Sequence, residues 1–83
     1  MFTVYVLYSA SFNKIYIGHT FNLDERMLSH NLLSKKGYTL KFRPWSLVYT
    51  EEFATKADAM KREKELKSAK GRKFIWELIE TSK

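Results

Sequence analysis

The apolar positions at the start of the chain fall into two short segments separated by polar residues. Residues 2–8 are mostly β-branched or aromatic, a pattern that predicts a strand. Residues 14–18 predict a second short strand, and the polar residues 9–13 between them predict a turn. The two segments are therefore expected to form a β-hairpin.

Helical signals follow the hairpin. Asn22 and Glu25 form a capping-box pair, which predicts a helix that begins at Asn22 and extends to about Leu33. Residues 34–43 lack apolar periodicity and predict a loop. Residues 45–50 alternate again and predict a third strand.

The last third of the chain predicts two helices. Thr55 and Asp58 form a second capping box, so a helix is expected from there to about Ala69, and Gly71 is expected to break it. A final short helix is predicted over residues 73–81 from its apolar positions. Those positions are Phe74, Ile75, Leu78 and Ile79.

The order of these elements is β-β-α-β-α-α. This order predicts an α/β fold of the α+β type, in which helices flank a three-stranded antiparallel or mixed sheet. We expect a single domain over residues 1–80, followed by a short C-terminal tail at residues 81–83.

Composition narrows the class of protein. The 83 residues carry a formal net charge of +6, include no cysteine and include only two histidines. The absence of cysteine excludes disulfide scaffolds, thiolate nucleophiles and iron–sulfur clusters, and two histidines are too few for a histidine-dominated zinc site. No apolar run approaches the roughly 18 residues of a membrane span, and no signal peptide is evident. We therefore expect a cytoplasmic protein with a polyanionic partner and no membrane association.

The positive charge is concentrated in the middle of the chain, because no acidic residue occurs between Arg26 and Thr50. The later basic residues of this stretch are Lys35, Lys36, Lys41 and Arg43. The interleaved aromatic residues are Tyr38, Phe42 and Trp45. This combination predicts DNA binding through phosphate contacts and base stacking. A solvated loop whose aromatic residues fold inward is the alternative.

Two tyrosines are candidates for chemistry. Tyr5 and Tyr16 each alternate with aliphatic neighbours, so they are expected to share the more polar face of the hairpin. Gly18 closes the second strand, where the missing side chain permits close approach of a backbone or a ligand. Simple cross-strand packing of the two rings is the alternative.

Arg26 and His30 are candidates for binding and proton transfer. They are four residues apart and therefore lie on one face of the predicted helix. A guanidinium suits bidentate phosphate binding, and an imidazole with a pKa near neutrality suits proton transfer. The alternative is an exposed pair on a solvated helix face.

Glu63 is a candidate metal ligand. The spacing of Ala59, Met60, Glu63 and Leu66 places all four on one stripe of the helix that begins near Thr55. A carboxylate among apolar residues is costly unless it is paired or binds a cation. Mg²⁺ is a suitable cation because it keeps most of its waters and needs few protein oxygens. A buried pair of Glu63 with an arginine is the alternative.

Together these residues resemble the signature of the GIY-YIG nuclease family, in particular its compact stand-alone bacterial branch. That branch is related to homing endonucleases and to the nuclease domain of an excision-repair enzyme. The string Thr3-Val4-Tyr5 is similar to the first half of the signature, and Tyr16-Ile17-Gly18 is an intact second half. Arg26, His30 and Glu63 follow at family-like spacing. The likeness extends over nearly the whole chain.

The resemblance implies hydrolysis of DNA phosphodiesters with a single Mg²⁺ or Mn²⁺ ion held by Glu63. The catalytic residues that it implies are Tyr5, Tyr16, His19, Arg26 and His30. Tyr5 would accept or relay the proton of the attacking water with help from Tyr16 or His19. Arg26 would bind the phosphate, and His30 would orient the phosphate or the water.

Two positions depart from the family pattern. His19 stands directly after the second motif, where many relatives have lysine, and its charge depends on pH. The asparagine found near the C-terminus of longer relatives has no evident counterpart in residues 70–73.

The resemblance implies a DNA endonuclease of repair or recombination, associated with the nucleoid. We expect it to select DNA structure, such as branched or damaged DNA, because no recognition helix or zinc finger is visible. Two alternatives stay open. One is a DNA-binding module without turnover, and the other is an accessory domain that docks on a repair protein through Phe42 and Trp45.

Overall fold

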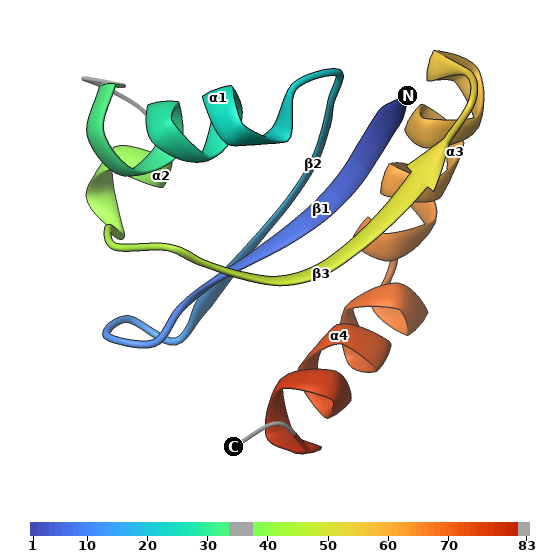
Figure 1. Cartoon of the computed structure of the whole chain (residues 1–83). Coiled ribbons are helices and arrows are strands. Elements are labelled where there is room, and N and C mark those ends of the chain that lie inside the picture. The colour runs from blue at the N-terminus through green and yellow to red at the C-terminus, as the bar shows by residue number, and fades with distance from the viewer. Residues whose placement is uncertain (34–37, 82–83) are drawn as a thin grey trace.

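A three-stranded antiparallel sheet with strand order β2-β1-β3 forms the centre of the protein. The computed structural model describes residues 1–33 and 38–81. The strands are β1 (Phe2–Ser9), β2 (Lys14–Thr20) and β3 (Ser46–Phe53). The helical segments are α1 (Leu23–Leu28), the π-helical turn η1 (Ser29–Leu33), α2 (Tyr38–Lys41), α3 (Lys56–Lys67) and α4 (Ala69–Thr81). Figure 1 shows α1 and α2 apart from α3 and α4, with the sheet between the two groups.

The predicted α+β architecture is confirmed, and the sheet is antiparallel throughout. The predicted hairpin is present, and Asn13 closes its turn with a positive φ of 54°, a conformation that asparagine tolerates well. β2 extends two residues beyond the predicted end, because His19 and Thr20 still pair with β1. None of the helices in the described part of the chain is long and apolar enough to cross a bilayer.

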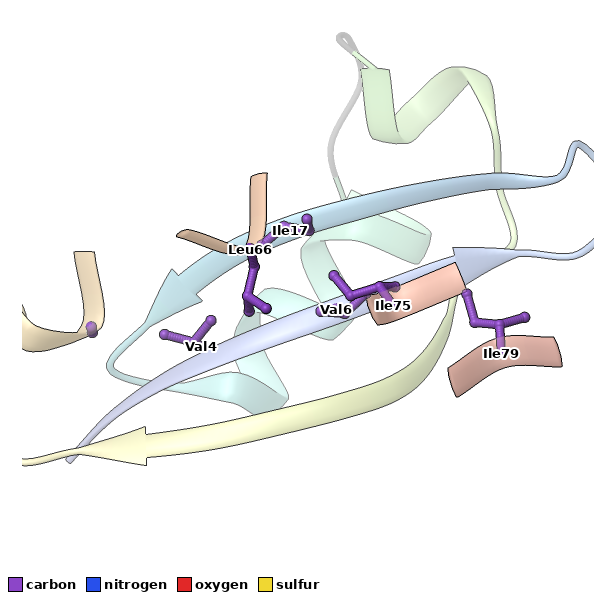
Figure 2. Packing of buried hydrophobic residues seen from close by; sticks show 7 residues of the cluster. Val4, Val6, Ile17, Leu66, Ile75 and Ile79 are labelled. Carbon is purple, nitrogen blue, oxygen red and sulfur yellow. The ribbon is translucent and has the colours of Figure 1, made fainter. Parts of the chain in front are cut away.

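Side-chain alternation along β1 divides the interior into two cores. One core lies between the sheet and the helices α3 and α4, where the side chains drawn in Figure 2 converge. Its buried members are Val4, Val6, Ile17, Ala59, Leu66, Ile75 and Ile79. The other core lies on the opposite face, under α1 and η1, and its buried members are Tyr5, Leu7 and Trp45. The first core is aliphatic at every buried position, whereas the second is largely aromatic.

Two predicted boundaries are wrong. The predicted loop at residues 34–43 contains the short helix α2. Gly71 does not end a helix, because the break falls at Ser68, whose extended backbone (φ −70°, ψ 165°) separates α3 from α4. A Cβ atom on Gly71 would lie 2.5 Å from the Cα of Leu66. Glycine is therefore needed here because the start of α4 packs against the end of α3.

Trp45 is also placed differently from the prediction. Its side chain is only 3% exposed and lies in the second core, so an exposed stacking or docking role for this residue is wrong. The side chain of Asn31 holds the backbone of Trp45 on both sides. The N–H of Trp45 donates to Asn31 Oδ1 at 2.7 Å, and Asn31 Nδ2 donates to the Trp45 carbonyl at 3.2 Å. These two hydrogen bonds fix the backbone of Trp45 immediately before β3 begins, and so hold its indole in the second core.

Candidate functional site

Tyr5 lies at the centre of the candidate site. It is in the middle strand, is 1% exposed, and pairs directly with Gly18 of the edge strand β2. A Cβ atom on Gly18 would lie 2.6 Å from the Tyr5 hydroxyl oxygen, so a side chain there would displace the phenol. Glycine at this position therefore allows the Tyr5 ring to lie across the edge strand of the sheet.

The helix beyond the hairpin brings Arg26 and His30 to Tyr5. α1 continues into η1 through the helical backbone of Ser29, and π-helical turns are frequent at functional sites. His30 is 4% exposed, and its Nε2 lies 2.8 Å from the Tyr5 hydroxyl. Arg26 also forms a hydrogen bond with Tyr5. Because a guanidinium can only donate, the Tyr5 oxygen accepts from Arg26 and its own proton is available to His30 Nε2.

Tyr16 completes an aromatic cluster on this face. Its ring centroid lies 6.3 Å from that of Tyr5 and 4.9 Å from that of His30. Arg26 forms a hydrogen bond with Tyr16 as well as with Tyr5, and the bond with Tyr5 is the larger cause of the raised pKa of Arg26. The structure therefore brings together both tyrosines, the arginine and the histidine that the sequence singled out.

Burial sets the protonation of this cluster. Burial raises the pKa of Tyr5 above its usual value of 10.0, and the hydrogen bond from Arg26 offsets this only in part. Burial also lowers the pKa of His30, and the positive charges of Arg26 and Arg43 act in the same direction. At neutral pH Tyr5 is therefore a neutral phenol beside a neutral imidazole, which can accept its proton.

Glu63 reaches the site from α3. Nδ1 of His19 lies 2.6 Å from its Oε1, and Nζ of Lys67 lies 2.8 Å from its Oε2. Burial acts to raise the pKa of Glu63, but the hydrogen bonds from Lys67 and His19 outweigh this effect and lower it. The carboxylate is thus ionised, and its charge contributes to raising the pKa of Tyr5. Among the causes of the raised pKa of Tyr5, the charge of Glu63 is the smallest.

The partners of Glu63 differ from those expected. Its ion pairs are with His19 and Lys67 and not with an arginine. His19 faces α3 and not the tyrosines, because alternation along β2 puts it on the face opposite to Tyr16. Lys67 was not among the predicted site residues, although its position four residues after Glu63 on a helix was a usable signal.

The apolar stripe of α3 is narrower than predicted. Ala59 and Leu66 are buried, but Met60 is 51% exposed. The buried face of α3 therefore runs beside Glu63, and the side chain of Glu63 lies at the margin of this face with 19% of it exposed. This position explains why the carboxylate can be ionised while still lying near the core.

The predicted DNA-binding residues that the structure describes differ in their exposure and in their contacts. Lys41 is exposed, and its ammonium lies 5.6 Å from the ring centre of Phe42. Arg43 is half-buried and donates two hydrogen bonds to backbone carbonyls of η1, at 2.6 Å to His30 and 3.1 Å to Ser29. Arg43 therefore supports the segment that positions His30. The other two predicted residues, Lys35 and Lys36, lie outside the described residues.

The donor set at Glu63 determines which metal it could hold. Residues 1–33 and 38–81 contain no group of three or more His, Asp or Glu side chains arranged for a metal ion. A single carboxylate suits Mg²⁺ or Mn²⁺, since such ions bind through one or two carboxylates, substrate phosphates and waters. A divalent ion at Glu63 would therefore keep most of its waters and would need Lys67 and His19 to release the carboxylate oxygens.

Three comparisons with known proteins bear on this site. The family model of the GIY-YIG catalytic domain matches residues 1–75. A UPF0213 protein of Staphylococcus haemolyticus is 43% identical over 56 residues, which cover 68% of either chain. A UPF0213 protein of Natronomonas pharaonis is 42% identical over 65 residues, which cover 78% of this chain and 75% of the relative. The solution structure of the UPF0213 protein BH0048 from Bacillus halodurans is 31% identical, with a TM-score of 0.55, and the match covers 94% of this chain and 85% of that one.

Proposed function

Because the chain belongs to the GIY-YIG family, we propose that it is a divalent-metal-dependent DNA endonuclease that hydrolyses phosphodiester bonds. The observation that carries this proposal is the arrangement of three groups around the phenol of Tyr5. A buried phenol at Tyr5 contacts both a guanidinium and a neutral imidazole, and the ionised carboxylate of Glu63 lies near enough to influence it. Each of these groups has a distinct task in phosphodiester hydrolysis.

Tyr5 is the proposed base. Its proton passes to Nε2 of His30, which lies 2.8 Å away, although burial raises the pKa of Tyr5 and lowers that of His30. The charge of Arg26 lowers the pKa of Tyr5 and so favours the phenolate, which then takes a proton from the attacking water. The water oxygen forms a bond to phosphorus while the bond from phosphorus to the leaving oxygen breaks. The leaving oxygen takes up a proton from solvent, and His30 gives its extra proton to solvent, which restores the site.

Arg26 is the proposed phosphate ligand. Its guanidinium carries several donors, so it can bind phosphate oxygens while it remains beside the tyrosine hydroxyls. In this position its charge stabilises the negative charge that develops on the phosphate in the transition state. Tyr16 stacks near Tyr5 and His30 and keeps both rings in place.

Glu63 is the proposed ligand of one Mg²⁺ or Mn²⁺ ion. When bound, such an ion supplies Lewis-acid stabilisation of the phosphate and of the leaving oxygen. Its positive charge would also oppose the effect of the Glu63 charge on Tyr5, and so favour the phenolate. His19, which contacts Glu63, would orient the carboxylate.

The proposed substrate is branched or damaged DNA at the nucleoid, in repair or recombination. Selection of DNA structure is favoured because the sequence contains no evident recognition-helix motif or zinc finger. The exposed Lys41 is the proposed phosphate contact on the rim, together with Lys35 and Lys36 of the acid-free stretch.

One observation favours a second candidate function. Both oxygens of Glu63 are already engaged by His19 and Lys67, so the carboxylate is neutralised without a metal ion. A chain whose Glu63 keeps these partners would bind DNA but would not cleave it. The second candidate is therefore a DNA-binding module on the nuclease scaffold.

A cleavage assay with matched glutamate variants tests the proposal. Wild type, Glu63→Gln and Glu65→Gln are incubated with duplex, nicked and branched DNA over a range of Mg²⁺ and Mn²⁺ concentrations. Glu65 is a suitable control because it lies on the same helix, is more exposed, and pairs only loosely with Arg62 at 3.8 Å. We expect Glu63→Gln to lose divalent-dependent cleavage and to keep near-wild-type DNA affinity, whereas Glu65→Gln keeps both.

Two results would contradict the proposal. Cleavage by Glu63→Gln at the wild-type rate would exclude Glu63 as the metal ligand. Binding of all three DNA forms by wild type, with no product at any metal concentration, would favour the DNA-binding module.

A further inference from the structure

A surface pocket of about 370 Å³ lies next to the candidate site, between the edge strand β2 and the junction of α3 and α4. Its lining residues are Ile15, Tyr16, Ile17, Lys67 and Arg72. Two of them also belong to the candidate site, since Tyr16 packs against His30 and Lys67 binds Glu63. The pocket is therefore adjacent to the site, although the proposed chemistry does not use it.

We infer that this pocket binds a phosphate of the DNA strand that neighbours the phosphate under attack. The inference rests on the proposed function, because it takes DNA as the ligand, and it adds a second binding point for the same strand. Its basis is the charge, the backbone and the shape of the pocket.

The pocket has two cationic residues, of which Lys67 is paired with Glu63 and Arg72 is not. Lys67 and Arg72 both line it, and no acidic residue does. In the described part of the chain no carboxylate pairs with the exposed guanidinium of Arg72. Arg62 provides the contrast, because it is held by Glu51 at 2.8 Å and approaches Glu65. A guanidinium without a carboxylate partner, at the mouth of a pocket, is suited to bidentate contact with phosphate.

The backbone around the pocket also favours an anion. β2 is an edge strand, so some of its backbone N–H groups are not paired with another strand, and residues 15–17 line the pocket, where such a donor would be available to a phosphate oxygen. α4 begins at Ala69, so Arg72 lies in the first turn, where the helix carries a partial positive charge. The partly buried side chain of Ile15 provides an apolar surface for the deoxyribose beside the phosphate.

Arg72 is the residue that tests the inference cleanly. Lys67 is unsuitable, because its replacement would also release Glu63. Lys73 is a matched control, since it is the next residue on the same helix, is exposed, and does not line the pocket. Arg72→Gln and Lys73→Gln lower the net charge of the protein by the same amount.

The experiment measures the affinity of wild type, Arg72→Gln and Lys73→Gln for fluorescent nicked DNA in EDTA, over a range of salt concentrations. We expect Arg72→Gln to weaken binding by about tenfold, because it loses a charge-assisted contact with phosphate. The slope of log affinity against log salt should fall by about one for this variant. Lys73→Gln should weaken binding less than about twofold, and both variants should melt within a few degrees of wild type.

A second measurement locates the contact. A 5′-phosphorylated thymidine dinucleotide is titrated into ¹⁵N-labelled protein, and the amide signals of residues 15–17 are followed by NMR. We expect these signals to shift in wild type and in Lys73→Gln, and to shift much less in Arg72→Gln.

The outcomes separate this inference from the proposed function. Equal loss of affinity in the two variants, with cleavage intact in wild type, would overturn the phosphate pocket and leave the nuclease assignment unaffected. Absence of DNA binding and cleavage in wild type would overturn both. An unaltered salt slope in Arg72→Gln would also exclude a phosphate contact at this residue.

Discussion

The two faces of strand β1 differ in the kind of side chain that they bury. Val4 and Val6 face α3 and α4 and lie in a core whose buried members are all aliphatic. Tyr5 faces α1 and η1, where it is buried together with His30 and contacts Arg26. A single strand therefore contributes to a purely hydrophobic core on one side and to a buried polar network on the other.

The difference indicates that the aliphatic face mainly stabilises the folded state, whereas the other face carries the groups proposed for proton transfer and phosphate binding. Burial of aliphatic side chains stabilises the folded state without restricting what the protein does. A buried phenol, imidazole and guanidinium are costly unless each is hydrogen-bonded, and here burial displaces the pKa values of both Tyr5 and His30. Such displaced pKa values are concentrated at functional sites, which is why we assign proton transfer and phosphate binding to the α1 face, whereas the proposed metal ligand Glu63 comes from α3 on the other side.

The largest effect is expected on cleavage, from Tyr5→Phe. The variant removes the hydroxyl that contacts His30 and Arg26, and loss of a general base lowers the rate by about 10²- to 10⁴-fold. The cleavage rate at saturating metal and DNA measures this change. Tyr8→Phe is the matched control, because Tyr8 is on the opposite face of the same strand and its hydroxyl contacts only the turn residue Asn13 among described partners.

Tyr8→Phe should cleave DNA at nearly the wild-type rate. Equal rates for Tyr5→Phe and wild type would show that the hydroxyl of Tyr5 takes no part in the reaction. Equal losses for the two variants would show that the faces do not differ in function.

The next effect is expected on stability, from Ile75→Ala. Ile75 is fully buried in the aliphatic core, so its truncation should lower the free energy of unfolding by about 2–5 kcal/mol, as measured by urea denaturation. The cleavage rate of the folded variant should stay near wild type at low temperature. Leu7→Ala is the counterpart in the other core, and it should lower both stability and cleavage because Leu7 packs in the same core as Tyr5. A large loss of cleavage in folded Ile75→Ala would contradict the separation of the two faces.

Local patterns in the sequence predicted much of this fold. The alternation of strand residues placed Tyr5 and Tyr16 on one face, as the structure has them. Two helix starts were predicted from capping residues, and in the structure the side chains of Asn22 and Thr55 accept hydrogen bonds from the expected backbone amides. The caps depend on residues three positions apart, and the shared face of the tyrosines depends on pairing within one short hairpin, which is why a sequence alone can reveal them.

Contacts between distant segments were not predictable in the same way. His19 contacts Glu63, which is 44 residues away, and the burial of Trp45 depends on Asn31, which is 14 residues away. A local pattern carries no information on such pairings. Gly71 is a further example of a feature that a local pattern does not predict. Glycine is needed at this position because α4 packs closely on α3, and not because a helix ends there.

The smallest effect is expected on the pH dependence of stability, from His30→Gln. The pKa of His30 is lowered from 6.5 in the folded protein, mainly by burial. The positive charges of Arg26 and Arg43 lower this pKa further. The other groups that face the imidazole ring are Tyr5 and Tyr16. Between the folded pKa and 6.5 the unfolded chain binds more protons than the folded one, so the free energy of unfolding rises with pH. This contribution is complete above 6.5 and declines as the pH falls below it.

His30→Gln has no titrating group at this position, so the slope of stability against pH should be shallower than in wild type across that window. Urea denaturation at intervals of about half a pH unit, from about pH 5 to about pH 8, measures the slope, and NMR titration of the His30 ring protons gives the folded pKa directly. A folded pKa equal to 6.5 would abolish the expected slope, and a folded pKa above 6.5 would reverse its sign, because the charged imidazole would then be favoured in the folded state. A folded pKa above neutrality would also remove the neutral proton acceptor beside Tyr5, on which the proposed role of the polar face depends.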